Sequence, residues 1–247
     1  MKFAPVFFLL VASCFGNMPS NLIQQGDYHD QRFEPDSALK FYQAAEQSAP
    51  RDATLLVRIA RQHVYRIDQR PTEAEKLREA KKALGYAERA VESDPNAADA
   101  HLAVAIVLGK MTTLMSNRDA IEASKRIKSS AETAVRLDPG SDYAWHLLGR
   151  WHQALAGMSP ITRGLARLIY GSLPEATNEQ AADCFKKAIA LKPGRLIHHI
   201  ELGRTYAQMG RSEEAREFIS RGLLMPSTEK DDPETKVRGR QALARLN

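Results

Sequence analysis

A recurring pattern of helix and proline constrains the fold of this chain more than any other feature. In four places an alanine-rich amphipathic segment ends at a proline, and a second helical pattern begins about four residues later. These prolines are Pro50, Pro95, Pro139 and Pro193. Proline cannot continue a helix and biases the preceding residue away from helical geometry, so each pair of helices ends at the same point. The pattern predicts a chain of similar helical hairpins.

The third and fourth units match the tetratricopeptide pattern, and Ala181 and Ala215 lie 34 residues apart, the period of that repeat. When the four units are aligned, one position always holds a small residue and the position before it always holds an apolar residue. A third position, in the second helices, is always alanine. These positions predict that the helices cross closely at the small residues, beside a buried apolar stripe. The three aligned columns are Ala60, Ala105, Gly149 and Gly203; Ile59, Val104, Leu148 and Leu202; and Ala45, Ala90, Ala134 and Ala188. We therefore predict an all-α fold, a tetratricopeptide-like solenoid with about four irregular repeats.

The predicted organisation is a signal peptide over residues 1–14, a linker over 15–34 and the solenoid over 35–247. The early prolines lie further apart than one repeat, and we expect the extra residues between the two helices of each early unit. The largest insert covers residues 158–177. Its apolar residues recur at helical spacing, which predicts a short amphipathic helix: Ile161, Leu165, Leu168 and Ile169. This helix would either pack on the solenoid as a lid or, with Arg163 and Arg167, lie on a membrane surface.

The N-terminus resembles a secretory signal. Residues 3–12 are almost wholly apolar but too few to span a bilayer, and residues 11–14, ending in Cys14, resemble a bacterial lipobox. Cleavage before Cys14 would leave that residue to carry a lipid; the alternative is an ordinary signal peptide that contains a cysteine. Either version predicts export across the inner membrane to the periplasm or, lipid-anchored, to the bacterial envelope. Cys184 is then a small buried apolar residue without a disulfide partner.

Composition and motifs argue against several classes of function. The net charge of +5 is spread over mixed-sign helical faces, which disfavours a nucleic-acid partner. Glycine-rich phosphate loops and nucleophile elbows are absent from the sequence, and its carboxylates fall on helix faces predicted to be exposed. His146 and His152 are six residues apart, not the three or four that place two ligands on one helix face. We expect no catalysis, no metal and no cofactor.

A positively charged column along the first helices is the candidate binding site. The predicted groove residues are Arg61, Lys110, His146, Arg150 and Arg204. Arginine binds carboxylates and phosphates with two parallel hydrogen bonds, so the column suits an acidic peptide, a C-terminal carboxylate or an anionic lipid headgroup. The alternative is that these side chains pair with neighbours such as Asp99 and Glu201 and bind nothing.

Several segments together resemble the regulator of microtubule dynamics family. They are residues 55–61, 145–151, the end of the insert at 170–177, residues 201–206, and the tail from Pro226 to Leu246. The resemblance implies helical repeats, association with microtubules, and for some members membrane tethering and lipid binding. The N-terminal signal instead indicates a bacterial-type relative.

Three functions follow from these observations. The first is a non-catalytic protein–protein interaction scaffold tethered at a bacterial membrane. The second is a lipid-binding or membrane-tethering protein. The third, if the source is eukaryotic, is a cytoplasmic, microtubule-associated regulator.

Overall fold

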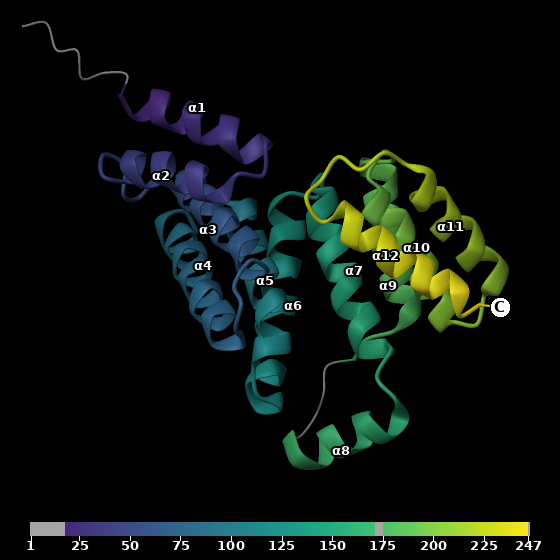
Figure 1. The fold of residues 1–247 in the computed structure, drawn as a ribbon. Helices are drawn as coiled ribbons and strands as arrows, with labels where there is room; N and C mark the ends of the chain where they lie inside the picture. The colour runs from purple at the N-terminus through teal and green to yellow at the C-terminus, as the bar shows by residue number, and fades with distance from the viewer. Residues whose placement is uncertain (1–17, 171–174, 247) are drawn as a thin grey trace, which may run out of the picture.

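The computed structural model describes residues 18–170 and 175–246, and within these ranges it contains helices and no strand. The expected signal peptide and lipobox, residues 1–14, lie outside the described residues. The helices follow one another in an extended stack (Figure 1). They are α1 (Met18–Gln31), α2 (Pro35–Glu46), α3 (Ala53–Ile67), α4 (Glu73–Ser93), α5 (Ala98–Met111), α6 (Asn117–Leu137), α7 (Asp142–Ala156), α8 (Pro160–Tyr170), α9 (Asn178–Leu191), α10 (Leu196–Gln208), α11 (Ser212–Leu224) and α12 (Asp232–Ala244), with a 3-10 turn over Thr112–Leu114.

Successive helices pair into hairpins, which confirms the predicted solenoid. In the described parts of the chain the pairs are α1 with α2, α3 with α4, α5 with α6, α7 with α9, and α10 with α11, followed by the single helix α12. There are thus five hairpins where the sequence predicted about four. Each hairpin also packs on the next, because an isolated helix pair cannot bury its apolar face.

The additional hairpin comes from the segment expected to be a linker. Residues 18–31 of that segment form α1, which packs on α2. A Cβ atom at Gly26 would lie 2.3 Å from the ring of Tyr42, so a glycine is needed where this ring packs against α1. Tyr42 is fully buried, and its hydroxyl donates a hydrogen bond to Asp27 over 2.7 Å. The solenoid therefore begins at α1 and not at residue 35.

The predicted columns occupy the helix crossings. Ala60 and Ala105 are fully buried, and a Cβ atom at Gly203 would lie 2.6 Å from a side-chain carbon of Ile219. At Gly149 the same atom would meet the ring of Phe185 at 3.0 Å. The four alanines of the second helices are fully buried, and the four residues of the apolar column are buried. The structure therefore confirms that small residues stand where the helices cross and that the apolar positions beside them are buried.

Most of the extra residues in the early units lengthen the second helices and do not form loops between helices. Both α4 and α6 contain 21 residues, against 14 in α9. Each long helix has a side-chain cap at its start, from Thr72 and Ser116 respectively, and each ends at an Asp-Pro step. A capped N-terminus and a proline stop fix both ends of these helices. The expectation of long connections was wrong for these two units.

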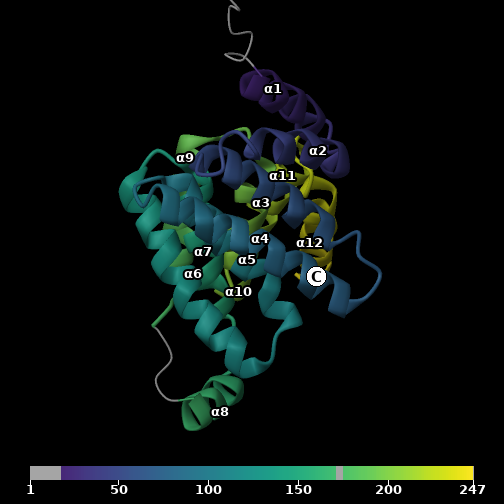
Figure 2. The same cartoon turned by 90° about the vertical axis from the view of Figure 1, so that its left-hand side faces the viewer.

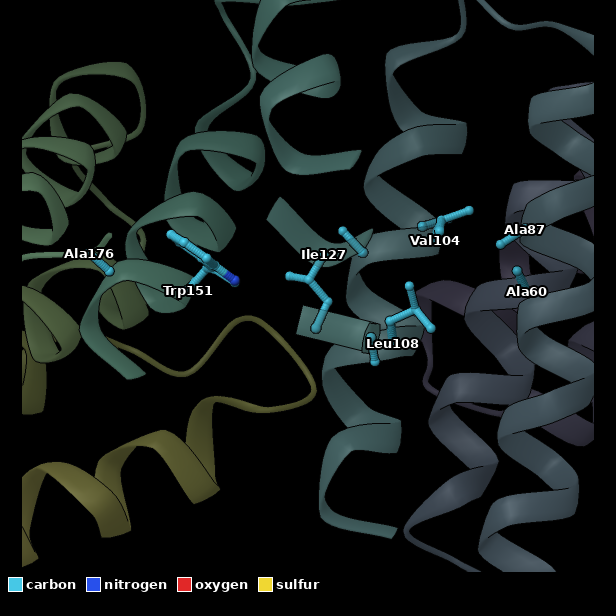
Figure 3. Close-up of a cluster of buried hydrophobic side chains, with 10 residues drawn as sticks. Ala60, Ala87, Val104, Leu108, Ile127, Trp151 and Ala176 are labelled. Atoms are coloured by element: carbon cyan, nitrogen blue, oxygen red, sulfur yellow. The ribbon is translucent and has the colours of Figure 1, made fainter. Parts of the chain in front are cut away.

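A continuous apolar core links the middle hairpins. Ala60, Val104, Ile127 and Trp151, from α3, α5, α6 and α7, belong to one buried cluster (Figure 3). The Trp151 indole N–H donates to the backbone oxygen of Ser124 over 2.9 Å, so its one polar group is satisfied. This cluster holds three hairpins together as one body.

The predicted insert helix forms as α8, but it does not pack as a lid. It lies at one end of the molecule, away from the stacked helices, whereas α1 lies at the opposite end (Figures 1 and 2). No other described helix packs closely against it.

The C-terminal segment returns across the solenoid. Lys230, which precedes α12, donates to the backbone oxygen of Tyr65 in α3 over 2.8 Å and lies 4.2 Å from the centre of its ring. The carboxylate of Asp232 is buried and accepts from the backbone N–H groups of Thr228 and Glu229, which fixes this turn. The segment that precedes α12 therefore contacts the second hairpin.

We predict that Gly203→Ala destabilises the protein although alanine favours helix. The added methyl group meets the backbone of α11 as well as Ile219, and such overpacking costs about 1–3 kcal/mol. Gly85→Ala in α4 is the matched control, because a Cβ atom there meets nothing within 4 Å and the change should stabilise by about 0.5–1 kcal/mol. Urea unfolding midpoints of the two variants measure both effects. Equal shifts in the same direction would contradict the crossing argument.

Candidate partner-binding groove

A groove of about 940 Å³ runs between α5, α6 and α7. The C-terminal segment contributes Asp231, Glu234 and Arg238 to its wall, and α8 contributes Ala166 and Ile169. Much of its floor is apolar: Ile106, Ile121, Leu147, Trp151, Leu155 and Met158. We call this hollow the central groove. Except for Trp151, these floor residues are only half-buried, so the chain leaves apolar surface open to a ligand.

Lys110 lines the central groove but is paired. Its ammonium group lies 3.0 Å from Asp68 Oδ2. Burial acts to lower the pKa of Lys110, but the carboxylates of Asp231 and Asp68 outweigh it and raise the pKa above its ordinary value. The lysine therefore stays charged and is balanced by the chain's own carboxylates.

Arg150 and Arg204 converge on one buried carboxylate. Glu201 is fully buried, and its Oε2 lies 2.6 Å from Nη1 of each of these arginines. Arg238 of α12 approaches Oε1 of the same carboxylate at 3.7 Å. Burial acts to raise the pKa of Glu201, but the three arginines outweigh it and the pKa falls. This network joins α7, α10 and α12, and it is the pairing with Glu201 that the sequence left as an alternative.

Arg61 is held by the additional first hairpin. Its guanidinium pairs with Asp30 of α1, which also accepts a hydrogen bond from the Gln62 amide over 2.7 Å. Burial acts to lower the pKa of Arg61, and the charge of Asp30 outweighs it. Arg61 does not line the central groove.

His146 is buried, with only 6% of its surface exposed, and it faces another histidine. Its Nδ1 lies 3.0 Å from Nδ1 of His198, whose Nε2 lies 2.8 Å from Asp142. Burial lowers the pKa of His198 to about 4 and holds that of His146 well below its ordinary value. Both rings are neutral at pH 7, so His146 donates to His198 while His198 donates to Asp142. The pair is a structural contact between α7 and α10.

The five predicted groove residues therefore do not all line one surface. Lys110, His146 and Arg150 line the central groove, whereas Arg61 and Arg204 do not. Asp99 pairs with none of them in the described ion pairs and lies beside a separate small hollow. The site residues that sequence reasoning missed are the apolar floor and the residues contributed by α12. Ile106, which follows Ala105 as Arg150 follows Gly149 and is apolar where the other units have arginine, was the available signal for that floor.

The groove combines its apolar floor with charged residues of both signs. Its charged residues include three carboxylates, Asp68, Asp231 and Glu234, beside the cations Lys76, Lys110, Arg150 and Arg238. Among the described residues no group of three histidine, cysteine or carboxylate side chains is arranged to hold a metal ion. Cys184 is buried and its thiol has a pKa raised by burial to about 12.

We predict that Glu201→Gln destabilises the fold by about 2–4 kcal/mol, because it leaves three half-buried arginines around a neutral buried side chain, where solvent screens part of the cost. Glu213→Gln is the control, since Glu213 forms an exposed ion pair on the same hairpin and should leave the unfolding midpoint unchanged. The contribution of Glu201 is present above its ordinary pKa and is lost as the pH falls through its lowered folded pKa, so the two proteins should converge in stability in acid. Equal effects of both substitutions at pH 7 would contradict this.

Solved structures that resemble this fold include tetratricopeptide proteins. A thermophilic protein of this class from Thermus thermophilus superimposes with a TM-score of 0.65 at 18% identity, covering 92% of this chain and 99% of its own. PilF of Pseudomonas aeruginosa gives a TM-score of 0.58 at 15% identity, covering 93% of this chain and 89% of its own. YrrB, described as having an unusual peptide-binding site, gives 0.50 at 17% identity, covering 89% and 90%. At these identities the likeness shows the fold alone.

Similarity to known sequences identifies the family of this chain, which the fold alone does not. Regulator of microtubule dynamics protein 1 from Bos taurus is 27% identical over 226 residues, which are 90% of this chain and 70% of the relative. Regulator of microtubule dynamics protein 2 from Mus musculus is 24% identical over 196 residues, 79% of this chain and 48% of the relative. The model of the family described as regulator of microtubule dynamics protein 1-3 matches residues 22–247, which include α8 and most of α1. The chain belongs to this family.

Proposed function

We propose that this protein is a non-catalytic interaction scaffold whose central groove receives a segment of a partner protein. The observation that carries the proposal is the apolar floor between α5, α6 and α7, which the chain's own helices leave half-exposed. Recognition grooves of helical proteins typically combine apolar contacts with a few polar groups at their edge. The tetratricopeptide fold, and a fold neighbour described as having a peptide-binding site, support the same interpretation.

The charges of the groove favour an apolar partner segment over the acidic peptide or anionic headgroup expected from the sequence. Lys110 is balanced by Asp68, and Arg150 by Glu201. An acidic ligand would have to displace these internal carboxylates and would also meet Asp231 and Glu234. An amphipathic helix or extended segment with apolar anchors needs no such exchange.

Blocking the groove should abolish this binding without harming the fold. Ala154 lies exposed on α7 and lines the groove, so Ala154→Trp fills it without removing any packed atom. A photo-crosslinking residue at position 154 identifies the partner segment, and fluorescence anisotropy with that segment should then show binding weakened at least about tenfold by the substitution. Ala190→Trp, on an exposed face of α9 outside the groove, is the matched control. Identical crosslinks from positions 154 and 190 would refute a groove-specific partner.

We further propose that the scaffold is tethered in a bacterial envelope through a lipid on Cys14. The support is the lipobox-like sequence that ends at this cysteine. None of the helices in the described ranges has the length and hydropathy needed to cross a bilayer.

Mass spectrometry of the full chain expressed in a bacterium tests the tether. We expect a diacylglyceryl-modified N-terminal Cys14 after cleavage, and loss of the chain from membranes washed with high salt in Cys14→Ala. Cys184→Ala is the control, because Cys184 is buried and should leave fractionation unchanged. An unmodified Cys14 would favour the third function, microtubule association, for which the support is the names of the relatives.

A further inference from the structure

α8 carries an apolar surface that the rest of the protein leaves uncovered. Ile161 and Leu168 are each 84% exposed, and Ile169 is 58% exposed. Ile161 and Leu168 are seven residues apart and Ile169 follows directly, so the three lie on one face of the helix. The other large apolar side chains of this exposure, such as Leu224, are scattered singly over different helices. Only α8 therefore gathers such residues among the described helices.

The charged residues of α8 are all positive. The helix contains Arg163 and Arg167 and no carboxylate, and no acidic residue occurs anywhere between Asp142 and Glu175. Arg163 donates to the backbone oxygen of Leu155, and neither arginine forms an ion pair within the described residues. On helical spacing Arg163 lies on the face opposite Ile161 and Leu168, and Arg167 lies on the flank between the two faces. An apolar face backed by cationic residues is the pattern of helices that lie in the interface of an anionic bilayer.

The position of α8 suits contact with a flat surface. In two perpendicular views it forms one extremity of the molecule, beyond the ends of the stacked helices (Figures 1 and 2). A helix placed there can reach a plane without the solenoid colliding with it. The same chemistry on an inner helix would have no access to a bilayer.

We propose that α8 is a membrane-binding element that inserts Ile161, Leu168 and Ile169 into the headgroup region of an anionic bilayer. This inference goes beyond the groove function, because it assigns a different ligand to a second surface, which meets the groove wall only at Ile169. A second copy of the chain is a poorer occupant. Three side chains offer far less than the roughly 800 Å² per partner that a stable protein pair buries, and paired α8 helices would bring arginines together. Burial of apolar side chains and attraction of the arginines to lipid phosphates both favour the bilayer.

A polarity-sensitive dye on α8 tests insertion directly. The full chain carries Cys14→Ser, so that the introduced cysteine is the accessible thiol, and Ile161→Cys or Leu168→Cys is labelled. We expect a blue shift with vesicles of phosphatidylcholine and phosphatidylglycerol, and a much smaller one with phosphatidylcholine alone or at high salt. Leu224→Cys is the matched control, because Leu224 is 88% exposed on α11, away from α8, and its label should not shift.

Affinity gives a second readout. Ile161→Glu with Leu168→Glu should lower partitioning onto the anionic vesicles at least about tenfold relative to Leu224→Glu. The N-terminal segment is identical in these proteins, so its own affinity for lipid cancels in the comparison. The positions are exposed, and circular dichroism confirms that each variant folds. No shift at either α8 position, or equal shifts at α8 and at 224, overturns the proposal. The first of these results would leave a protein as the occupant of this face.

Discussion

The tight packing of the two helices within each hairpin is the constraint on which the rest of the structure depends. A Cβ atom at Gly203 would lie within 2.9 Å of the backbone of α11, and one at Gly149 would lie 3.0 Å from the ring of Phe185, while Ala60 and Ala105 are fully buried. Each hairpin is therefore thin, and its apolar stripe reaches the next hairpin in the stack. The additional first hairpin follows the same rule, with Gly26 against Tyr42. Because every unit relies on its neighbour for burial, the order of the units sets the path of the solenoid.

Once the units are stacked, their charged residues become partners over long sequence distances. The carboxylate of Glu201 draws arginines from α7, α10 and α12 into one buried network, and Asp30 draws Arg61 toward α1. These contacts take from the central groove much of the positive charge that the sequence places along it. What remains available to a ligand is largely apolar surface, beside charges that the protein already balances. The internal pairs thus determine the kind of partner that the groove favours.

The two candidate surfaces differ in how the fold presents them. The central groove is built from three packed helices and one returning segment, so its shape follows from the core beneath it. α8 stands apart from that core and keeps Ile161, Leu168 and Ile169 exposed. A scaffold that engages a protein through one surface and a bilayer through the other would hold its partner at a set height above the membrane. Ile169 also lies on the wall of the groove, but Ile161 and Leu168 do not, so substitutions at these two positions separate the roles.

The sequence by itself determined the helical hairpins, the small and apolar columns, and the insert helix. These are local or periodic features, and a spacing of three or four residues is sufficient to reveal them. It did not reveal α1, because that helix packs through polar contacts and one glycine as well as apolar residues. Nor did it locate the extra residues of α4 and α6, since the proline spacing fixes only the length of a whole unit. The pairing of Arg61 with Asp30 and of Arg150 with Glu201 joins residues 31 and 51 positions apart. Only the tertiary structure decided these, because stacking, not sequence proximity, brings those charges together.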